Sequence, residues 1–302
     1  MKISPKLSIW LRVIRPFSFT ASVTPVLVGA VLALSYPDEV YWFLLPMVII
    51  CSLLFHAGTN LVSEYYDFEK GVDRTHTYGS SKVLVQDLLP AREVLIGGII
   101  LFGTGFALGM TMVYFRGAPV FWLGVVGLLG GFCYTGKPVG YKYLALGDIL
   151  VFTLMGPLMV VGSYYVMTGS YSPEVLFVSL PIGFLVAAIL HANNLRDIVH
   201  DREANVRTVA NLLGLKAARI EYFLLVGGAY LSVVVMVLAG TVGAWALLVF
   251  LSVPAAIKNM RSIRHARPDN VSAIAMIDVQ TAQHHFLFGI LLVAGIAISA
   301  MF

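Results

Sequence analysis

Long apolar runs, separated by short polar joints, constrain this chain more than any other feature. They lie near residues 17–35, 41–63, 93–113, 118–135, 144–167, 175–195, 219–238, 242–258 and 283–302. A run of about 20 apolar residues is long enough for an α-helix to cross a bilayer. Only 12% of the residues are charged, about half the share of a soluble domain. The sequence therefore predicts an all-α, polytopic membrane protein of about nine transmembrane helices.

The basic residues divide unequally between the two sides that nine spans would define. The N-terminus and the loops after spans 2, 4, 6 and 8 share one side, which carries every Lys and Arg except Arg116. Cytoplasmic loops are enriched in Lys and Arg, so this side is expected to face the cytoplasm across the cell membrane. Its two long loops cover about residues 64–92 and 196–218. No linker interrupts the chain, which predicts one domain over residues 1–302.

Two acidic motifs lie at the ends of spans 2 and 6, on this same side. Motif 1 consists of Asn60, Glu64 and Asp67, with Asp73 beyond them, and motif 2 of Asn194, Asp197 and Asp201. The spacings place each set on one helical face if the preceding helix continues through it. Clustered carboxylates at a membrane boundary favour a hard divalent cation such as Mg²⁺. The alternative is that these acids only solvate helix ends, but acids there oppose the helix dipole.

The two motifs also resemble each other. His56-Ala-Gly-Thr-Asn60 ends span 2, and His191-Ala-Asn-Asn194 ends span 6; each Asn is followed seven residues later by an Asp. This similarity suggests two diverged four-helix halves whose motifs face each other across a central cavity.

Basic residues near the motifs suggest a phosphorylated ligand. The candidates for contact with a diphosphate are Arg74, Lys82, Lys142, Arg196 and Arg202. Each could instead reflect membrane orientation alone. Acids that hold Mg²⁺ beside cations are what a diphosphate needs, because both neutralise a phosphate leaving group. The sequence has no Gly-rich phosphate loop or dinucleotide fingerprint, and no nucleic-acid partner is expected.

Polar and aromatic residues near the same side could line an acceptor pocket. The candidates are Asn193, Tyr65, Tyr134, Tyr141, His56 and His191. Alternatively, the tyrosines could belong to an interfacial belt and the histidines could be packing residues. Asp148 could form an ion pair with Lys142. Asp278, His284 and His285 are weaker candidates.

The two motifs, after spans 2 and 6 of a nine-helix protein, resemble those of the UbiA superfamily of intramembrane prenyltransferases. The segment Asn193-Asn-Leu-Arg-Asp-Ile-Val-His-Asp-Arg202 matches the family's second motif closely. The runs from Glu64 to Asp73 and from Gly79 to Asp87, and Tyr134-Thr-Gly-Lys-Pro138, look like the 1,4-dihydroxy-2-naphthoate polyprenyltransferase branch. Motif 1 departs from the common Asn-Asp-x-x-Asp form, because Ser63 and Glu64 stand at its first two positions.

The resemblance implies two Mg²⁺ ions that grip the diphosphate of an allylic prenyl donor. Asn60, Glu64, Asp67 and Asp73 would hold one ion, and Asn194, Asp197 and Asp201 the other; the four aspartates are the expected catalytic residues. The expected reaction transfers a polyprenyl group, through an allylic cation, to an aromatic acceptor. The acceptor expected from the branch is 1,4-dihydroxy-2-naphthoate, in menaquinone biosynthesis.

Two alternatives stay open at this stage, and so does the oligomeric state. One is prenyl transfer to a non-aromatic acceptor such as a glycerol-phosphate ether. The other is a cation-coupled transporter, which can also combine intramembrane acids with an internal repeat.

Overall fold

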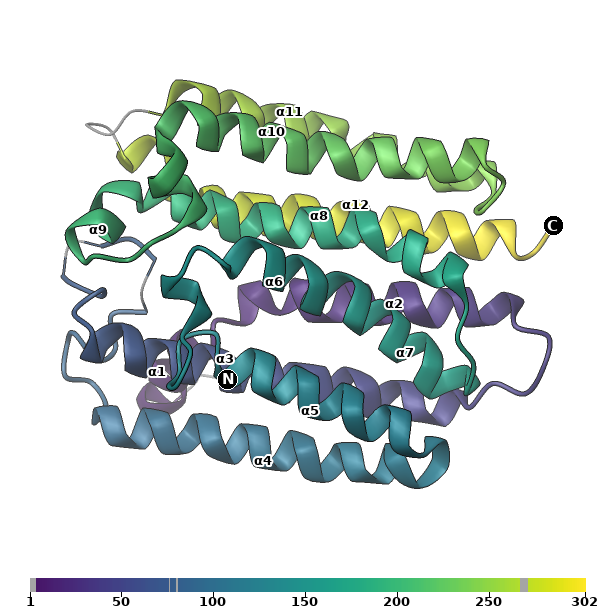
Figure 1. The fold of residues 1–302 in the computed structure, drawn as a ribbon, viewed down its shortest axis with the longest axis horizontal. Helices are drawn as coiled ribbons and strands as arrows, with labels where there is room; N and C mark the ends of the chain where they lie inside the picture. Colours follow the sequence, from purple (N-terminus) through teal and green to yellow (C-terminus); the bar gives the residue numbers. More distant parts are fainter. Residues whose placement is uncertain (1–3, 76, 80, 267–270) are drawn as a thin grey trace.

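The computed structural model describes residues 4–75, 77–79, 81–266 and 271–302. Over these residues the chain is helical, without a β-strand. Its helices are α1 (Pro5–Ile14), α2 (Thr20–Leu32), α3 (Leu45–Glu69), α4 (Ala91–Arg116), α5 (Ala118–Phe132), α6 (Gly147–Thr153), α7 (Met159–Thr168), α8 (Pro173–Arg196), α9 (Ile198–Glu203), α10 (Val209–Leu238), α11 (Val253–His265) and α12 (Ile277–Ser299). Most of them run along one common direction (Figure 1).

The predicted polytopic membrane protein is confirmed. In the described part, eight helical segments are long and apolar enough to cross a membrane: Pro16–Ser35, Trp42–Glu69, Ala91–Arg116, Gly147–Thr168, Pro173–Arg196, Val209–Leu238, Ala244–His265 and Ile277–Ser299. Four of these join shorter helices end to end, as α6 joins α7 through a π-helical turn at Leu154–Leu158.

The remaining expected span, at 118–135, is the short helix α5. Its 15 residues extend about 22 Å, less than the ~30 Å hydrocarbon thickness of a bilayer. It runs back beside α4 and also contacts α3 (Figure 1). Among the described residues, the bundle therefore has eight helical segments long enough to span a membrane and one shorter apolar helix.

The two motifs differ in their local structure. Helix α3 continues to Glu69, so Asn60, Glu64 and Asp67 share one helix and the expected loop at 64–92 begins only after it. Helix α8 ends at Arg196, Asp197 is its C-terminal cap, and Asp201 lies on α9. The prediction that motif 2 lies on one continuous helical face is therefore wrong. The expected loop at 196–218 contains α9 and the beginning of α10.

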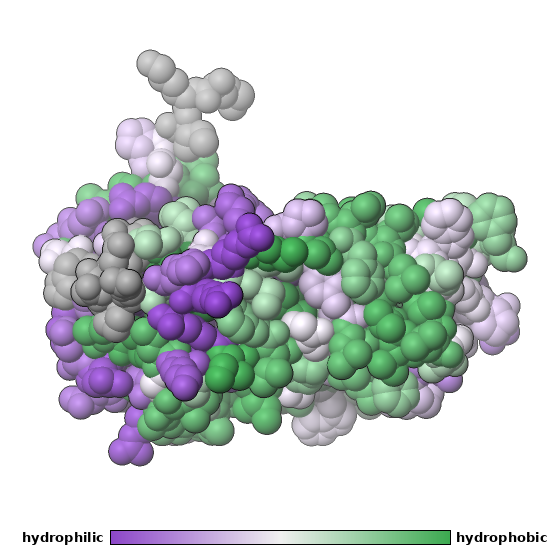
Figure 2. Space-filling view, turned by 90° about the horizontal axis from the view of Figure 1, so that it is seen from above, coloured by the Kyte–Doolittle hydropathy of each residue, from purple (hydrophilic) through white to green (hydrophobic). Residues whose placement is uncertain are grey.

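Both motifs lie at the same end of the bundle, at the left in Figure 1. Hydrophilic residues gather at this end, and an apolar surface extends along much of the rest of the visible face (Figure 2). Backbone pairing of Leu144 with Arg207 joins the loop before α6 to the loop before α10 at this end. Of the basic residues that define the charge asymmetry, Lys2 and Arg267 lie outside the described residues.

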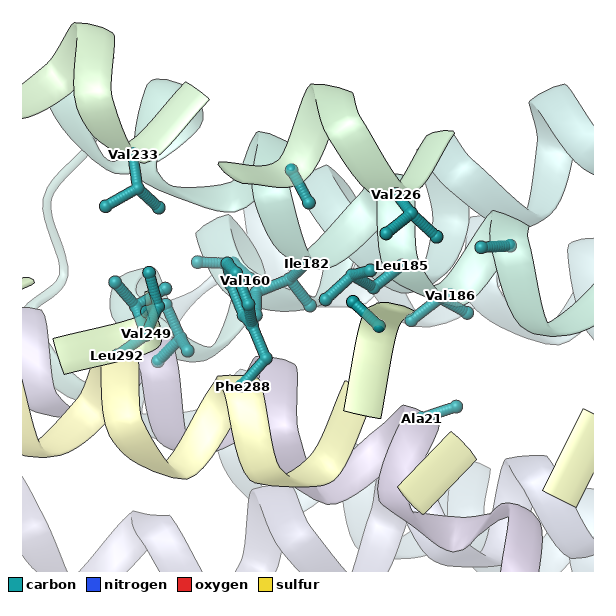
Figure 3. Packing of buried hydrophobic residues seen from close by; sticks show 14 of the residues in the cluster. Ala21, Val160, Ile182, Leu185, Val186, Val226, Val233, Val249, Phe288 and Leu292 are labelled. Atoms are coloured by element: carbon teal, nitrogen blue, oxygen red, sulfur yellow. The ribbon is translucent and has the colours of Figure 1, made fainter. Parts of the chain in front are cut away.

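Helix α8 occupies the centre of the main core. Its residues Ile182, Leu185 and Val186 lie between α10 on one side and α2, α7 and α12 on the other (Figure 3). Because lipid is as apolar as these side chains, close backbone approach matters more than hydrophobicity for packing in a bilayer. A Cβ atom at Gly156 would lie 2.5 Å from the Cα atom of Gly183, and one at Gly29 would lie 2.4 Å from the Val160 carbonyl oxygen. These glycines allow the central helices to cross closely.

Helix α3 packs extensively on α4, and α8 packs extensively on α10. The internal repeat itself stays a prediction.

Candidate active site

A cavity of about 400 Å³ opens among the helices at the end that carries the motifs. Its mouth is polar, and its deeper part is lined by apolar residues of α3, α4, α5, α7 and α8. On α3 alone the lining extends from Asp67 to Val48, which is about 28 Å along a helix axis. The cavity therefore joins an acidic mouth to a long apolar interior.

Five aspartates line this cavity among the described residues: Asp67, Asp73, Asp197, Asp201 and Asp278. The first four are the aspartates expected from the two motifs. The cationic residues that line it are Arg15 and Lys142, and His200 lies there too. The mouth thus has more carboxylates than lysines and arginines.

Asp67 is held by two residues of the loop before α6. Its Oδ2 lies 2.6 Å from Lys142 Nζ, and its Oδ1 accepts a 2.9 Å hydrogen bond from the Tyr143 hydroxyl. Burial opposes the charge of Lys142, but Asp67 outweighs this and raises the Lys142 pKa well above its usual value. The expected pairing of Lys142 with Asp148 is therefore wrong, because Lys142 pairs with Asp67.

The negative charges of Asp73 and Asp201 are less well compensated than that of Asp67. The Oδ2 atom of Asp73 is buried and has no hydrogen-bond partner among the described residues. Burial, and then the charges of Asp67 and Glu64, raise the pKa of Asp73 to about 7. Burial, together with the nearby Asp197, raises the pKa of Asp201 to about 7 as well.

Asp197 and Asp278 share one buried guanidinium. Arg196 donates from Nε and NH2 to the Asp197 carboxylate, and its NH1 lies 2.8 Å from Asp278 Oδ2. The Arg196 side chain is 1% exposed and does not line the cavity. This arginine joins α8 to α12 and fixes two carboxylates at the mouth.

Glu64 is engaged away from the cavity. Its carboxylate lies 2.7 Å from Arg15 NH2 and accepts a hydrogen bond from the Ser81 hydroxyl. Asn60 does line the cavity, and its amide donates to the Ile14 carbonyl oxygen at 2.7 Å. Both residues therefore also fasten the segment before α2 to α3.

Asn194 and His191 lie behind the motif 2 aspartates, Asp197 and Asp201, and do not line the cavity. The Asn194 amide donates to Asp148 Oδ1, and His191 contacts Asp148, Glu221 and the Ala218 carbonyl oxygen.

The remaining predicted cations stay outside the cavity lining. The Arg74 side chain is 40% exposed and pairs with Glu203 at 3.4 Å. Lys82 donates to the Arg74 carbonyl oxygen and to the Thr77 hydroxyl. Arg202 is exposed on α9.

Four of the six predicted pocket residues line the cavity: Asn193, Tyr134, Tyr141 and His56. The rings of Tyr134 and Tyr141 meet edge to face at 5.3 Å, and His56 is held by the hydroxyls of Ser18 and Ser22. Tyr65 packs on Tyr66 and does not line the cavity.

Sequence reasoning did not select Arg15 or His200 and gave Asp278 little weight. Arg15 directly precedes the first span, and Asp278 begins the last one. Both lie on the side of the membrane that carries the motifs, which is the signal that could have found them.

The carboxylates present fit Mg²⁺. Among the described residues, no three of the cavity aspartates bring carboxylate oxygens within 4.8 Å of one another, so they do not form a closed cage. Mg²⁺ rarely occupies such cages and is usually held by one or two carboxylates, waters and substrate phosphates. The excess of carboxylates and the unpartnered Asp73 oxygen leave charge for such ions to compensate.

Comparison with known proteins identifies the family. A sequence model of the UbiA prenyltransferase family matches residues 22–287. The 1,4-dihydroxy-2-naphthoate octaprenyltransferase of Bacillus subtilis is 34% identical over 94% of this chain and 91% of that protein. The UbiA prenyltransferase domain-containing protein 1 of Danio rerio is 33% identical over 99% of this chain and 87% of that protein.

One solved structure is that of a UbiA homologue from Archaeoglobus fulgidus bound to GPP and Mg²⁺. It superposes with a TM-score of 0.61 at 15% identity and covers 94% of this chain and 99% of that one. The sequence matches show that this chain is a prenyltransferase and that it belongs to the UbiA prenyltransferase family.

Proposed function

We propose that this protein transfers a polyprenyl group from an allylic prenyl diphosphate to 1,4-dihydroxy-2-naphthoate, with two Mg²⁺ ions. The observation that carries the proposal is the union of an acidic mouth with a long apolar cavity. The relative from Bacillus subtilis, named for the same acceptor, supports the choice of a naphthoate. Mg²⁺ beside GPP in the Archaeoglobus fulgidus homologue supports the metal.

The diphosphate of the donor would lie at the mouth. Asp67 and Asp73 are the proposed ligands of one ion, with Asn60 beside them, and Asp197 and Asp201 those of the other. Bound Mg²⁺ would neutralise the diphosphate and make it a better leaving group. Lys142 and Arg15, the cations that line the cavity, are the proposed direct contacts to phosphate oxygens.

The remaining motif residues would act by positioning. Arg196 orients Asp197, and Glu64 holds Arg15. Asn194 donates a hydrogen bond to Asp148, behind Asp197 and Asp201. Arg74, Lys82 and Arg202 do not line the cavity, so we assign them no contact with the donor.

The reaction would begin when the bond between C1 of the prenyl group and the diphosphate oxygen breaks. The diphosphate keeps the electron pair, and the allylic cation is exposed to an electron-rich aromatic carbon of the acceptor. A new C–C bond forms, and the ring regains aromaticity by releasing a proton, or CO₂ where that carbon carries the carboxylate, and by keeping the electron pair of the broken bond. The apolar lining excludes water, which would otherwise capture the cation.

The acceptor ring would lie beside Tyr134 and Tyr141, below the carboxylates. The amide of Asn193, which also lines the cavity, offers a hydrogen bond to a ring oxygen. The polyprenyl tail would extend along the apolar interior toward Val48 on α3.

The mouth is proposed to face the cytoplasm, because nearly all Lys and Arg residues lie at that end. A Lys82→Cys variant should react with a membrane-impermeant thiol reagent only in inverted vesicles. Reaction in intact cells would contradict this orientation.

The acceptor is tested with the purified protein in detergent, one labelled geranylgeranyl diphosphate donor and a panel of acceptors. The panel contains 1,4-dihydroxy-2-naphthoate, 4-hydroxybenzoate and a geranylgeranylglyceryl phosphate. The naphthoate should be prenylated far faster than the other two. Preference for the glyceryl phosphate would replace this acceptor while leaving the family reaction intact.

A further inference from the structure

A second cluster of metal-ligating side chains lies behind motif 2. Asp148 on α6, His191 on α8 and Glu221 on α10 each place one ligand atom within 4.8 Å of the other two. None of the three lines the cavity that holds the motif aspartates. Asp148 and His191 are almost fully buried, and the side chain of Glu221 is 24% exposed.

The ring of His191 shows which of its atoms faces the carboxylates. Its Nε2 lies 2.8 Å from the carbonyl oxygen of Ala218, which can only accept a hydrogen bond. In the neutral imidazole the proton is therefore on Nε2, and Nδ1 presents a lone pair to Asp148 and Glu221. Metal-bound histidines are commonly fixed in this way, by donation from the second ring nitrogen to a backbone carbonyl.

The distances within the cluster favour a metal over a shared proton. His191 Nδ1 lies 3.4 Å from Asp148 Oδ2 and 3.7 Å from Glu221 Oε2. A charge-assisted hydrogen bond from an imidazolium would be about 2.7–2.9 Å. Ligand atoms at the corners of a tetrahedron with bonds of about 2.05 Å to zinc lie about 3.3 Å apart.

The charges of the cluster also favour a bound metal ion. Among the described residues, neither carboxylate pairs with a lysine or an arginine, and Glu221 Oε2 is buried without a hydrogen-bond partner. Beside an uncharged imidazole, two carboxylates without a cationic partner are costly inside a membrane protein. One divalent cation would make the site neutral with an uncharged imidazole.

We propose that Asp148, His191 and Glu221 bind one structural Zn²⁺ ion, with water as the fourth ligand. One imidazole and two carboxylates suit zinc, whereas Mg²⁺ prefers oxygen ligands and keeps its waters. The ion ties α6, α8 and α10 together. Because Asp148 also accepts a hydrogen bond from Asn194, the ion holds the helix end that carries motif 2.

The experiment uses the full chain, purified in detergent with Mg²⁺ present throughout. Zinc is removed with a chelator and titrated back while zinc content and thermal unfolding are measured. The wild type should bind roughly one zinc per chain, and its melting temperature should rise on zinc addition. Substitution with Co²⁺ should give the visible absorption of a tetrahedral site with nitrogen and oxygen ligands.

Glu221→Gln is the informative variant, because it keeps the shape of the side chain and removes one ligand charge. Its zinc affinity should fall by about 10-fold or more, since even changes outside the ligands have effects of 10–100-fold. Glu174→Gln, at an exposed carboxylate on α8, is the matched control and should keep zinc. Asp201→Asn should also keep zinc, which separates this site from the mouth.

Absence of bound zinc and of any stabilisation by added zinc in the wild type would overturn the proposal, and so would full zinc binding by Glu221→Gln. Should Glu221→Gln not fold, the wild-type Co²⁺ spectrum decides: an octahedral spectrum, or none, contradicts the site. These readouts do not depend on prenyl transfer.

Discussion

Lys142 Nζ lies 2.6 Å from Asp67 Oδ2, and both side chains are largely buried. The two residues come from different parts of the bundle, the loop before α6 and the end of α3. The pair therefore fixes one motif aspartate and places a cation at the mouth of the cavity. Removal of one partner of a buried pair leaves the other charge uncompensated.

Lys142→Ala should lower the stability of the protein by about 3–5 kcal/mol and severely reduce prenyl transfer. Thermal unfolding and initial rates with a labelled donor measure the two effects. Arg74→Ala is the control, because Arg74 forms an exposed pair worth at most about 1 kcal/mol. Equal behaviour of the two variants would contradict a special role for Lys142.

The ligand set of motif 1 can be tested at Glu64 and Asp67. Glu64→Gln should retain much of the activity, because its carbonyl oxygen can still accept the hydrogen bond from Arg15 while its amide donates to the Ser81 hydroxyl. Asp67→Asn should lower kcat by about 100-fold, the size expected for loss of a group that stabilises the leaving charge. Comparable losses in both variants would instead make Glu64 a metal ligand.

Mg²⁺ binding should depend on pH through Asp73 and Asp201. Their pKa values are raised to about 7, so below pH 7 both carboxyls hold protons that a metal must displace. The Mg²⁺ concentration for half-maximal activity should therefore rise as the pH falls from 8 to 6, by up to about 10-fold per unit for each proton released.

The pH test needs Asp73→Asn as its comparison, since that variant has lost one titrating group. Its pH dependence should be shallower than that of the wild type. A wild-type Mg²⁺ requirement that is the same at pH 6 and pH 8 would contradict this account of the two aspartates.

The apolar interior should set the length of prenyl chain that the enzyme accepts. Gly124 lines the cavity, and a Cβ atom there would meet no other atom within 4 Å. Gly124→Leu should leave transfer of short chains intact and slow transfer of long ones, as measured by competition between donors. Gly103→Leu, on the exposed face of α4, should change neither. Unchanged chain-length preference in Gly124→Leu would mean that the tail follows another path.

The sequence was sufficient for the architecture because long apolar runs admit few structures in a bilayer. It also located the four motif aspartates at one cavity. It could not give the partners of Arg196, because Asp278 is distant in the sequence and reaches it only through packing of α12 against α8. Arg196 was expected to contact diphosphate and instead lies buried between two carboxylates.

The sequence also did not predict where some of the helices end. The break at Asp197 separates Asn194 on α8 from Asp201 on α9, although their spacing is compatible with one helix. The spacing of residues in a sequence does not show where tertiary contacts interrupt a helix. The short α5 posed the same difficulty, because its apolar run continues through Cys133 beyond the last helical residue.

The central claim is that both motifs act on one diphosphate through Mg²⁺. The most direct measurement compares wild type and Asp201→Asn in transfer of a labelled polyprenyl group to 1,4-dihydroxy-2-naphthoate, with Mg²⁺ and with a chelator. The wild type should form product only with Mg²⁺, and Asp201→Asn should be at least about 100-fold slower while still folded. Product formation by the wild type in the chelator, or an unchanged rate in Asp201→Asn, would contradict the claim.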